Sequence, residues 1–342
     1  MGKYIVKRLL QLIPVLIGIT LLTFLMMHVA GSDAITEMYA DKAVSQEIID
    51  AKKAELGLDK PIIEQYFIWL GGLLTGDMGV SYVSGKNVFD TFISKLPATL
   101  LLTLLSIVLT VIISIPLGIL MAVKQNKITD YVLRFCSFIG NSLPNFFVAL
   151  VLMEILAIKL HWLPVIPIGI SFKAAIMPTL TLAIAMSAKY MRQVRAVVLD
   201  ELSKDYVTGA KARGIPYKAT LIKSVLRSSM ITIITLLAIS IGSLLGGTAI
   251  IETIFMWDGV GKLAVDAITM RDYPLIEAYV VWLAIIYVVV NLISDLLYHA
   301  LDPRIRLDDA VTFRRKVTAR RAPSTKSKQN GRDSLLKRGK SE

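Results

Sequence analysis

Six long apolar stretches alternate with polar segments along the chain, and each approaches the length of about 20 residues that a helix needs to cross a bilayer. Inside a bilayer the backbone has to satisfy its own hydrogen bonds, so stretches of this kind predict helices. The sequence therefore predicts an all-α, polytopic integral membrane protein with six transmembrane helices. The stretches are Leu9–Val29, Leu100–Val123, Phe135–Ile158, Ala174–Met191, Met230–Ile251 and Leu275–Leu297.

Proline and glycine mark places where the predicted helices bend or approach a neighbour. Pro116 lies in the second stretch and Pro144 in the third, and both predict a bend. Gly242, Gly246 and Gly247 in the fifth stretch form a pattern of small residues that lets two helix backbones come close together. The neighbouring helix belongs either to the same chain or to another subunit, and the sequence leaves both open.

Basic residues gather on one side of the predicted membrane. With the N-terminus inside, 28 of the 38 Lys and Arg residues fall on the cytoplasmic side and 10 outside. Positive residues favour the cytoplasmic side, so both termini are predicted to be cytoplasmic. The tail from Arg304 onward carries +9 of the net charge of +12. This placement indicates attraction to anionic membrane lipid, or a charge cluster that only sets the topology, and argues against nucleic acid as a partner.

The polar segments divide the chain into regions. Between the first two stretches, Ser45–Leu56 predicts a polar helix and Ile62–Leu74 an amphipathic helix near the lipid interface. The end of the chain has no apolar period and predicts a disordered basic tail. The predicted regions are an N-terminal transmembrane helix (1–30), an extracytoplasmic region (31–95), a core of five helices (96–300) and a basic cytoplasmic tail (301–342).

No residue pattern in the sequence indicates catalysis. Gly259-Val260-Gly261-Lys262 looks like part of a phosphate loop, but Met256 stands where the first glycine belongs, and Leu263 follows the lysine. The His, Met and Glu side chains that might bind a metal form no spaced cluster. We therefore expect no enzymatic activity, no cofactor and no metal site. Cys136, the single cysteine, is expected to be a small buried residue of the third stretch.

The most informative polar segment is Asp205-Tyr206-Val207-Thr208-Gly209-Ala210-Lys211-Ala212-Arg213-Gly214, on the predicted cytoplasmic side. Its alanines favour a helix, Gly214 predicts the end of that helix, and Pro216 cannot continue it. A short helix with a fixed end suits docking, because a rigid element transmits force with little bending. The segment resembles the coupling loop of permease subunits of ABC-type importers, in particular of the branch that transports peptides and nickel.

Further strings, in the same order as in that branch, support the resemblance, which covers about Lys3–Arg306. Two departures stand out. Asp258 replaces a common proline, and Thr208-Gly209-Ala210 replaces the Glu-Ala-Ala of the general importer family. The matching strings are Glu55-Leu56-Gly57-Leu58-Asp59-Lys60-Pro61, Gly76-Asp77-Met78-Gly79-Val80-Ser81-Tyr82, Thr248–Gly261, Arg271-Asp272-Tyr273-Pro274 and Leu301–Arg306.

The resemblance implies the type I ABC importer permease fold in a cell membrane, with the coupling loop at about 194–227. It implies four kinds of neighbour: a second homologous permease subunit, two ATP-binding subunits, an extracytoplasmic substrate-binding protein and membrane lipid. ATP hydrolysis then takes place in the partner subunits. The residues expected to couple this chain to an ATP-binding subunit are Asp205, Tyr206, Thr208, Ala210, Lys211, Arg213 and Gly214.

A polar cluster beside Pro144 is the candidate for the translocation path. Asn141, Ser142 and Asn145 stand within an otherwise apolar stretch. Polar side chains at membrane depth are costly unless they face water or partner helices. We expect these three residues to line the path; hydrogen bonding between helices is the alternative.

Three strings resemble nickel permeases most closely, so nickel, free or chelated, is the first expectation for the substrate. Di- and oligopeptide permeases carry similar strings, which makes peptides the alternative. A membrane scaffold that transports nothing is a more distant one. In such machines the external binding protein usually selects the ligand, so the permease sequence says little about it. The strings are Ser142–Phe147, His161–Pro164 and Gly246–Glu252.

Overall fold

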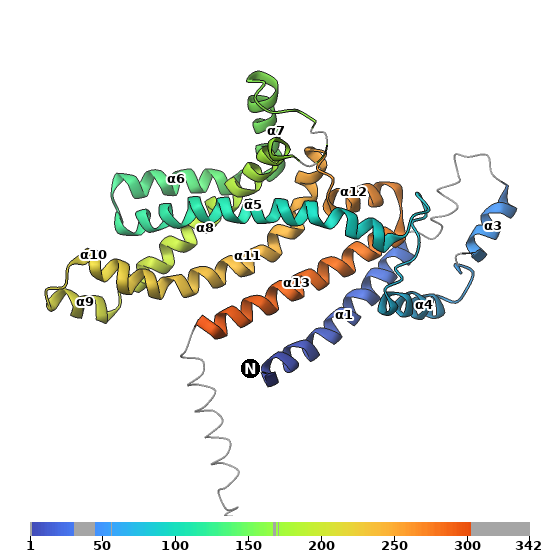
Figure 1. Cartoon of the computed structure of the whole chain (residues 1–342), viewed down its shortest axis with the longest axis horizontal. Helices are drawn as coiled ribbons and strands as arrows, with labels where there is room; N and C mark the ends of the chain where they lie inside the picture. Colours follow the sequence, from blue (N-terminus) through green and yellow to red (C-terminus); the bar gives the residue numbers. More distant parts are fainter. Residues whose placement is uncertain (1, 31–44, 56, 167–168, 170, 302–342) are drawn as a thin grey trace, which may run out of the picture. The chain divides into compact units, whose positions relative to one another are not determined.

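The computed structural model describes residues 2–30, 45–55, 57–166, 169 and 171–301 (Figure 1). The regular structure in this part of the chain is helical apart from one isolated antiparallel bridge between Val80 and Asn87. The prediction of an all-α protein is confirmed. Residues Met1–Ser294 form one compact unit, and Asp295–Glu342 belong to a second. All the contacts discussed below lie in the first unit. The predicted basic tail, from residue 302 onward, is outside the described residues.

Among the described residues, four helices are long and apolar enough to cross a membrane. The first two are the single helices α5 (Val88–Val123) and α8 (Phe172–Leu202). The third, Tyr217–Gly242, begins in α10 (Tyr217–Thr220) and continues into α11 (Arg227–Ile254); the fourth lies in α13 (Tyr273–Leu301). The first apolar stretch lies on α1 (Gly2–Ala30), where Ile13–Val29 is a shorter apolar segment.

The third predicted span is a bent pair rather than one helix. Its first half, α6 (Ile128–Ser142), and its second half, Asn145–Lys159, meet at an angle of 100°. Between them Leu143 and Pro144 are extended, and proline has no N–H to continue the helical hydrogen bonds. The bend expected at Pro144 is confirmed. By contrast, α5 continues through Pro116 without a break. All six predicted stretches fall on helices, and of these two prolines only Pro144 interrupts its helix.

The remaining helices are short and connect or flank these spans. Two of them, predicted as Ser45–Leu56 and Ile62–Leu74, agree with the structure to within one or two residues at each end. The short helices are α3 (Gln46–Glu55), α4 (Ile62–Thr75), α7 (Asn145–Leu152), the π-helix η1 (Met153–Lys159), α9 (Asp205–Ala212), the π-helix η2 (Leu221–Leu226) and α12 (Val260–Met270).

The most extensive packing in the described chain joins α5 to α8. On α5, small residues four positions apart form a buried stripe that ends at Gly118. A Cβ at Gly118 would lie 2.7 Å from the Val194 side chain and 2.8 Å from the Met191 carbonyl oxygen. Small residues in such a stripe let two membrane helices approach closely. The stripe is Ser106, Thr110, Ser114 and Gly118.

A buried ion pair joins α6 to α8. Asp130 is fully buried, and Arg195 donates to both of its carboxylate oxygens, with Nε–Oδ1 and Nη2–Oδ2 distances of 2.8 and 2.9 Å. The face of α6 that contains Asp130 and Ser137 packs inward. Cys136 lies off this face and is exposed, so the expectation that it is buried within the chain was wrong.

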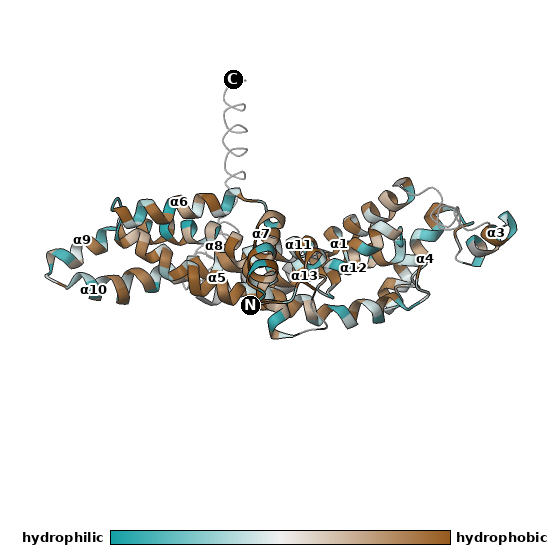
Figure 2. Cartoon of the chain, turned by 90° about the horizontal axis from the view of Figure 1, so that it is seen from above, coloured by the Kyte–Doolittle hydropathy of each residue, from teal (hydrophilic) through white to brown (hydrophobic). Residues whose placement is uncertain are grey.

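The hydropathy of the surface agrees with a membrane protein. Figure 2 shows hydrophobic residues, in brown, along α5 and α11, and hydrophilic residues, in teal, on α9. On α5, Leu104 and Ile112 are 58% and 62% exposed in the isolated chain. Apolar side chains so exposed along a whole helix need lipid or another subunit to cover them.

Candidate functional site

The short helix α9 and the turn after it form the cytoplasmic element predicted from the sequence. The helix spans Asp205–Ala212, and Gly214 follows in the left-handed conformation with φ of 74°. The N–H groups of Gly214 and Ile215 donate to the carbonyl oxygens of Lys211 and Ala210, at 3.0 and 3.1 Å. These bonds close the last turn of the helix, which a residue without a Cβ permits at low cost. The predicted short helix and its glycine end are confirmed.

One face of α9 packs on the protein, and the other is exposed. Ala210 is buried, and Val207 packs against a cluster centred on Tyr190, Val194 and Val225. Val207 therefore joins the inner face of α9 to a cluster whose residues come from α5, α8, η2 and α11. The exposed face contains six of the seven residues predicted to couple, Asp205, Tyr206, Thr208, Lys211, Arg213 and Gly214. Ala210, the seventh, contributes to the inner face instead.

Glu201, at the end of α8, holds the start of α9 in place. Its carboxylate accepts a hydrogen bond from the Tyr206 hydroxyl at 2.9 Å and one from the Lys204 ammonium at 2.5 Å. Partial burial of the phenol, together with this bond and the charge of Glu201, raises the pKa of Tyr206 to about 12. The phenol therefore stays protonated and remains a donor. Sequence reasoning did not select Glu201, although an acidic residue directly before the coupling segment was a signal for it.

The polar cluster at the bend of α6 and α7 is exposed in the isolated chain. Asn141, Ser142 and Asn145 all lie there, and the Ser142 hydroxyl donates to the Phe138 carbonyl oxygen at 2.9 Å. Of the three, Asn145 lines a cavity of about 180 Å³, which the other two do not.

Lys189 is the charged residue of that cavity. It lies within the membrane-spanning helix α8, with Asn145, Ser240 and Gly247 among its neighbours in the lining. Its side chain is exposed in the isolated chain. A lysine on a spanning helix is costly in lipid, so this face of α8 needs water or another subunit beside it.

The three glycines of the fifth stretch differ in their surroundings. A Cβ at Gly242 would lie 2.7 Å from the ring of Tyr287, so α11 and α13 come close at this point. Gly246 and Gly247 have no atom of the described chain within 4 Å of such a Cβ. Only Gly242 therefore takes part in close packing within the chain.

Two motifs that are far apart in the sequence meet at the other end of the spans. Asp272 is buried and accepts hydrogen bonds from the Ser81 hydroxyl and from the Tyr82 N–H, the latter at 3.1 Å. These residues come from the strings Gly76–Tyr82 and Arg271–Pro274. The loop after α4 is thus joined to the connection between α12 and α13.

A second buried carboxylate, Glu252 near the end of α11, closes the turn before α12. It accepts from the Thr99 hydroxyl at 2.7 Å and from the Lys262 N–H at 2.9 Å, and Thr99 in turn accepts from the Val260 N–H. A Cβ at Gly261 would lie 2.8 Å from the Glu252 carboxylate and 2.7 Å from the backbone of Ala249. The glycine is therefore needed for the close approach. The string read as a failed phosphate loop builds this turn.

The residue that departs from the branch, Asp258, lies in the same turn and forms an ion pair with Lys95 of α5. Glu154 is half exposed, and its carboxylate lies 3.5 Å from the Lys159 ammonium. In the part of the chain that the structure describes, no three His, Cys, Asp or Glu side chains are grouped to hold a metal ion.

Comparison with known proteins agrees with this arrangement. Two family models match, the N-terminal membrane component of binding-protein-dependent transport systems over residues 1–103 and their inner membrane component over residues 114–307. The chain is 40% identical over 315 residues to the oligopeptide transport system permease protein AppB of Bacillus subtilis, covering 89% of this chain and 99% of that protein. It is 36% identical over 306 residues to the glutathione transport system permease protein GsiC of Escherichia coli K12, covering 90% and 99%.

Among solved structures, an inward-facing form of the MetNI methionine ABC transporter has a similar fold, with a TM-score of 0.52 at 15% identity over 62% of this chain and 96% of that one. This similarity concerns the fold alone. The family match covers more than half of the chain, and both relatives are matched over almost their whole length. The chain therefore belongs to the family of binding-protein-dependent transport system inner membrane components, the permease subunits of ABC importers.

Proposed function

We propose that this permease carries oligopeptides or small peptides the size of glutathione into the cell. The observation that supports this substrate class is the similarity to two permeases named for oligopeptide and glutathione transport, over about nine-tenths of the chain. Nickel, the first expectation from short strings, receives no comparable support. Strings of a few residues are shared across the branch. The similarity to the two peptide permeases, by contrast, extends over more than 300 positions.

The chain works with ATP-binding subunits and a substrate-binding protein, as its family does. In the proposed arrangement it pairs with a second homologous permease. The exposed face of α9 docks on one of the two ATP-binding subunits. Closure of those subunits on ATP then moves α9, and α8 and α11 move with it, because Val207 packs against a cluster that includes residues of both helices. Transport is a shift between two packings of the spans that nucleotide biases.

The path in this proposal runs along the exposed face of α8. Lys189, Asn145 and Ser240 line the cavity there, and a paired permease would enclose it. A lysine, an amide and a hydroxyl offer hydrogen bonds to a peptide backbone and a positive charge to its carboxylate. Asn141 and Ser142, at the bend, extend the polar surface toward the partner.

Uptake measurements distinguish the substrate classes. Cells with and without this gene, and with the gene restored, should be offered a radiolabelled tripeptide, glutathione and radioactive nickel under the same conditions. We expect peptide uptake that depends on ATP to be lost on deletion and restored with the gene, while nickel uptake stays unchanged. Loss of nickel uptake alone would return the assignment to nickel. A deletion that leaves all three uptakes unchanged would favour a scaffold.

The orientation is tested by labelling single cysteines. Cys136 is first replaced by serine, and a cysteine is then placed either at Ser45, directly before α3, or at Ser324, in the tail. With both termini inside, an impermeant maleimide should label intact cells at position 45 and not at 324. Both variants should label equally after the membrane is opened, which controls for reactivity. The reverse pattern in intact cells would contradict the topology.

A further inference from the structure

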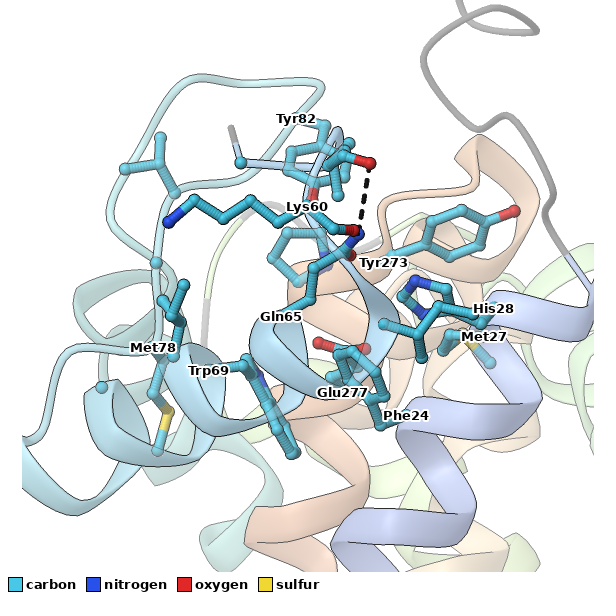
Figure 3. Close-up of a pocket in the computed structure, with 18 of the residues that line it drawn as sticks. Phe24, Met27, His28, Lys60, Gln65, Trp69, Met78, Tyr82, Tyr273 and Glu277 are labelled. Carbon is cyan, nitrogen blue, oxygen red and sulfur yellow. Dashed lines mark hydrogen bonds between the residues drawn. The ribbon is translucent and has the colours of Figure 1, made fainter. Parts of the chain in front are cut away.

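A pocket of about 530 Å³ lies away from the α8 cavity, between α1, α4, the loop after α4 and the start of α13 (Figure 3). Its volume falls within the range of about 300–1,000 Å³ that small-molecule sites occupy. Figure 3 shows aromatic side chains from all four of these elements around it. In the proposed topology the pocket opens on the outer side. Its aromatic lining residues are Phe24, Trp69, Tyr82 and Tyr273, with His28 beside them.

The pocket contains one buried carboxylate. Glu277, in the second turn of α13, is only 8% exposed and lines the pocket. Among the described residues no hydrogen bond or ion pair reaches its carboxylate, unlike those of Glu252, Asp272 and Asp130. A buried charge without a partner is costly, and such a group in a native protein needs an explanation. A positively charged ligand provides one.

The other charged groups of the lining have different surroundings. Asp77 accepts a hydrogen bond from the Gly79 N–H at 2.9 Å, and the Lys60 ammonium lies 3.0 Å from the half-exposed Glu64 carboxylate. Lys53 also takes part in an interaction. The cations therefore lie on the exposed α3–α4 side, whereas the unpaired carboxyl group of Glu277 is buried. This separation of charge matches a zwitterion that enters with its ammonium group first.

Aromatic rings near Glu277 add a second attraction for an ammonium group. The rings of Phe24 and Trp69 are 5.9 Å apart, and those of Phe24 and His28 are 4.5 Å apart. The faces of aromatic rings attract cations, and the rings also accept apolar groups. Burial raises the pKa of Tyr82, with smaller contributions from Glu277 and Asp272, so its phenol stays a neutral donor at the edge of the site.

From these contacts we infer that the pocket binds the N-terminal ammonium group of a short peptide, with Glu277 as its anion and Phe24 and Trp69 beside the first side chain. This inference rests on the proposed function. The pocket lies apart from the α8 cavity, so it is an outer site where a peptide can bind before it enters the path. The ethanolamine headgroup of a lipid has the same ammonium chemistry, and the test separates the two sources.

The test measures equilibrium binding of a radiolabelled dipeptide, Ala-Phe, to the assembled membrane complex in nanodiscs without the external binding protein. We expect Glu277→Gln to weaken binding by about ten- to a hundredfold, because a charge-assisted hydrogen bond is lost. Glu47→Gln, which removes an exposed carboxylate of α3 outside the pocket, should leave binding unchanged. Equal affinities of Glu277→Gln and the wild type would overturn the site.

Two further arms need no variant of the pocket. N-acetyl-Ala-Phe, which has no ammonium group, should bind the wild-type complex about as weakly as Ala-Phe binds Glu277→Gln; equal binding of the two peptides would refute the inference. Nanodiscs with and without phosphatidylethanolamine should bind Ala-Phe equally, and strong competition by that lipid would assign the pocket to a headgroup instead. Peptide uptake by wild-type cells decides the proposed function separately, so either proposal can fail alone.

Discussion

Replacing Gly214 by proline is expected to abolish uptake while the protein still inserts into the membrane. Gly214 has φ of 74°, and its N–H donates to the Lys211 carbonyl oxygen. Proline holds φ near −65° and has no N–H, so the turn after α9 loses about 3 kcal/mol or more. That cost lowers the population of the docked turn by more than about a hundredfold. ATP hydrolysis by the partner subunits should continue without transport.

Gly214→Asn is the matched control for this change. Asparagine tolerates the left-handed conformation and retains the N–H, so it should preserve most of the uptake. Expression and copurification of the ATP-binding subunits are measured for each variant. The coupling role of α9 is refuted if Gly214→Pro, expressed normally, transports at the wild-type rate.

Replacing Glu252 by alanine is expected to produce the largest loss of stability. The carboxylate is fully buried and accepts hydrogen bonds from Thr99 and from the Lys262 N–H. Alanine leaves both donors without an acceptor, at about 1–3 kcal/mol each, so the total is on the order of 2–6 kcal/mol. The thermal midpoint of the purified complex in detergent should fall, together with its yield. Glu252→Gln retains an acceptor and should lie between the alanine variant and the wild type.

Glu154→Ala provides the control for Glu252→Ala. Its carboxylate is half exposed and pairs with Lys159 at 3.5 Å, so its removal should change stability by less than about 1 kcal/mol. If the two alanine variants unfold at the same temperature as the wild type, the contacts of Glu252 do not hold α5, α11 and α12 together.

Much of this fold follows from local properties of the sequence. Six apolar stretches predicted the helices because a backbone in lipid has few alternatives to a helix. Gly214 and Pro216 predicted the end of α9, since the left-handed turn and the missing N–H are properties of single residues. Pro144 predicted a bend for the same reason, although not its angle of 100°.

What only the tertiary structure decided is which polar groups meet across long separations. Nothing local to Glu252 indicates that it bonds with Thr99, 153 positions away, and Asp272 with Ser81 is a comparable case. The burial of Cys136 and Ala210 was also not predictable from the sequence: Cys136 is exposed, and Ala210 is buried. Both lie on amphipathic or apolar helices, and which face of a helix is covered depends on its neighbours. The sequence of a helix determines the period of its apolar positions, whereas packing sets the rotation of the helix about its own axis. The packing of α13 leaves Glu277 buried and without a partner in the described chain.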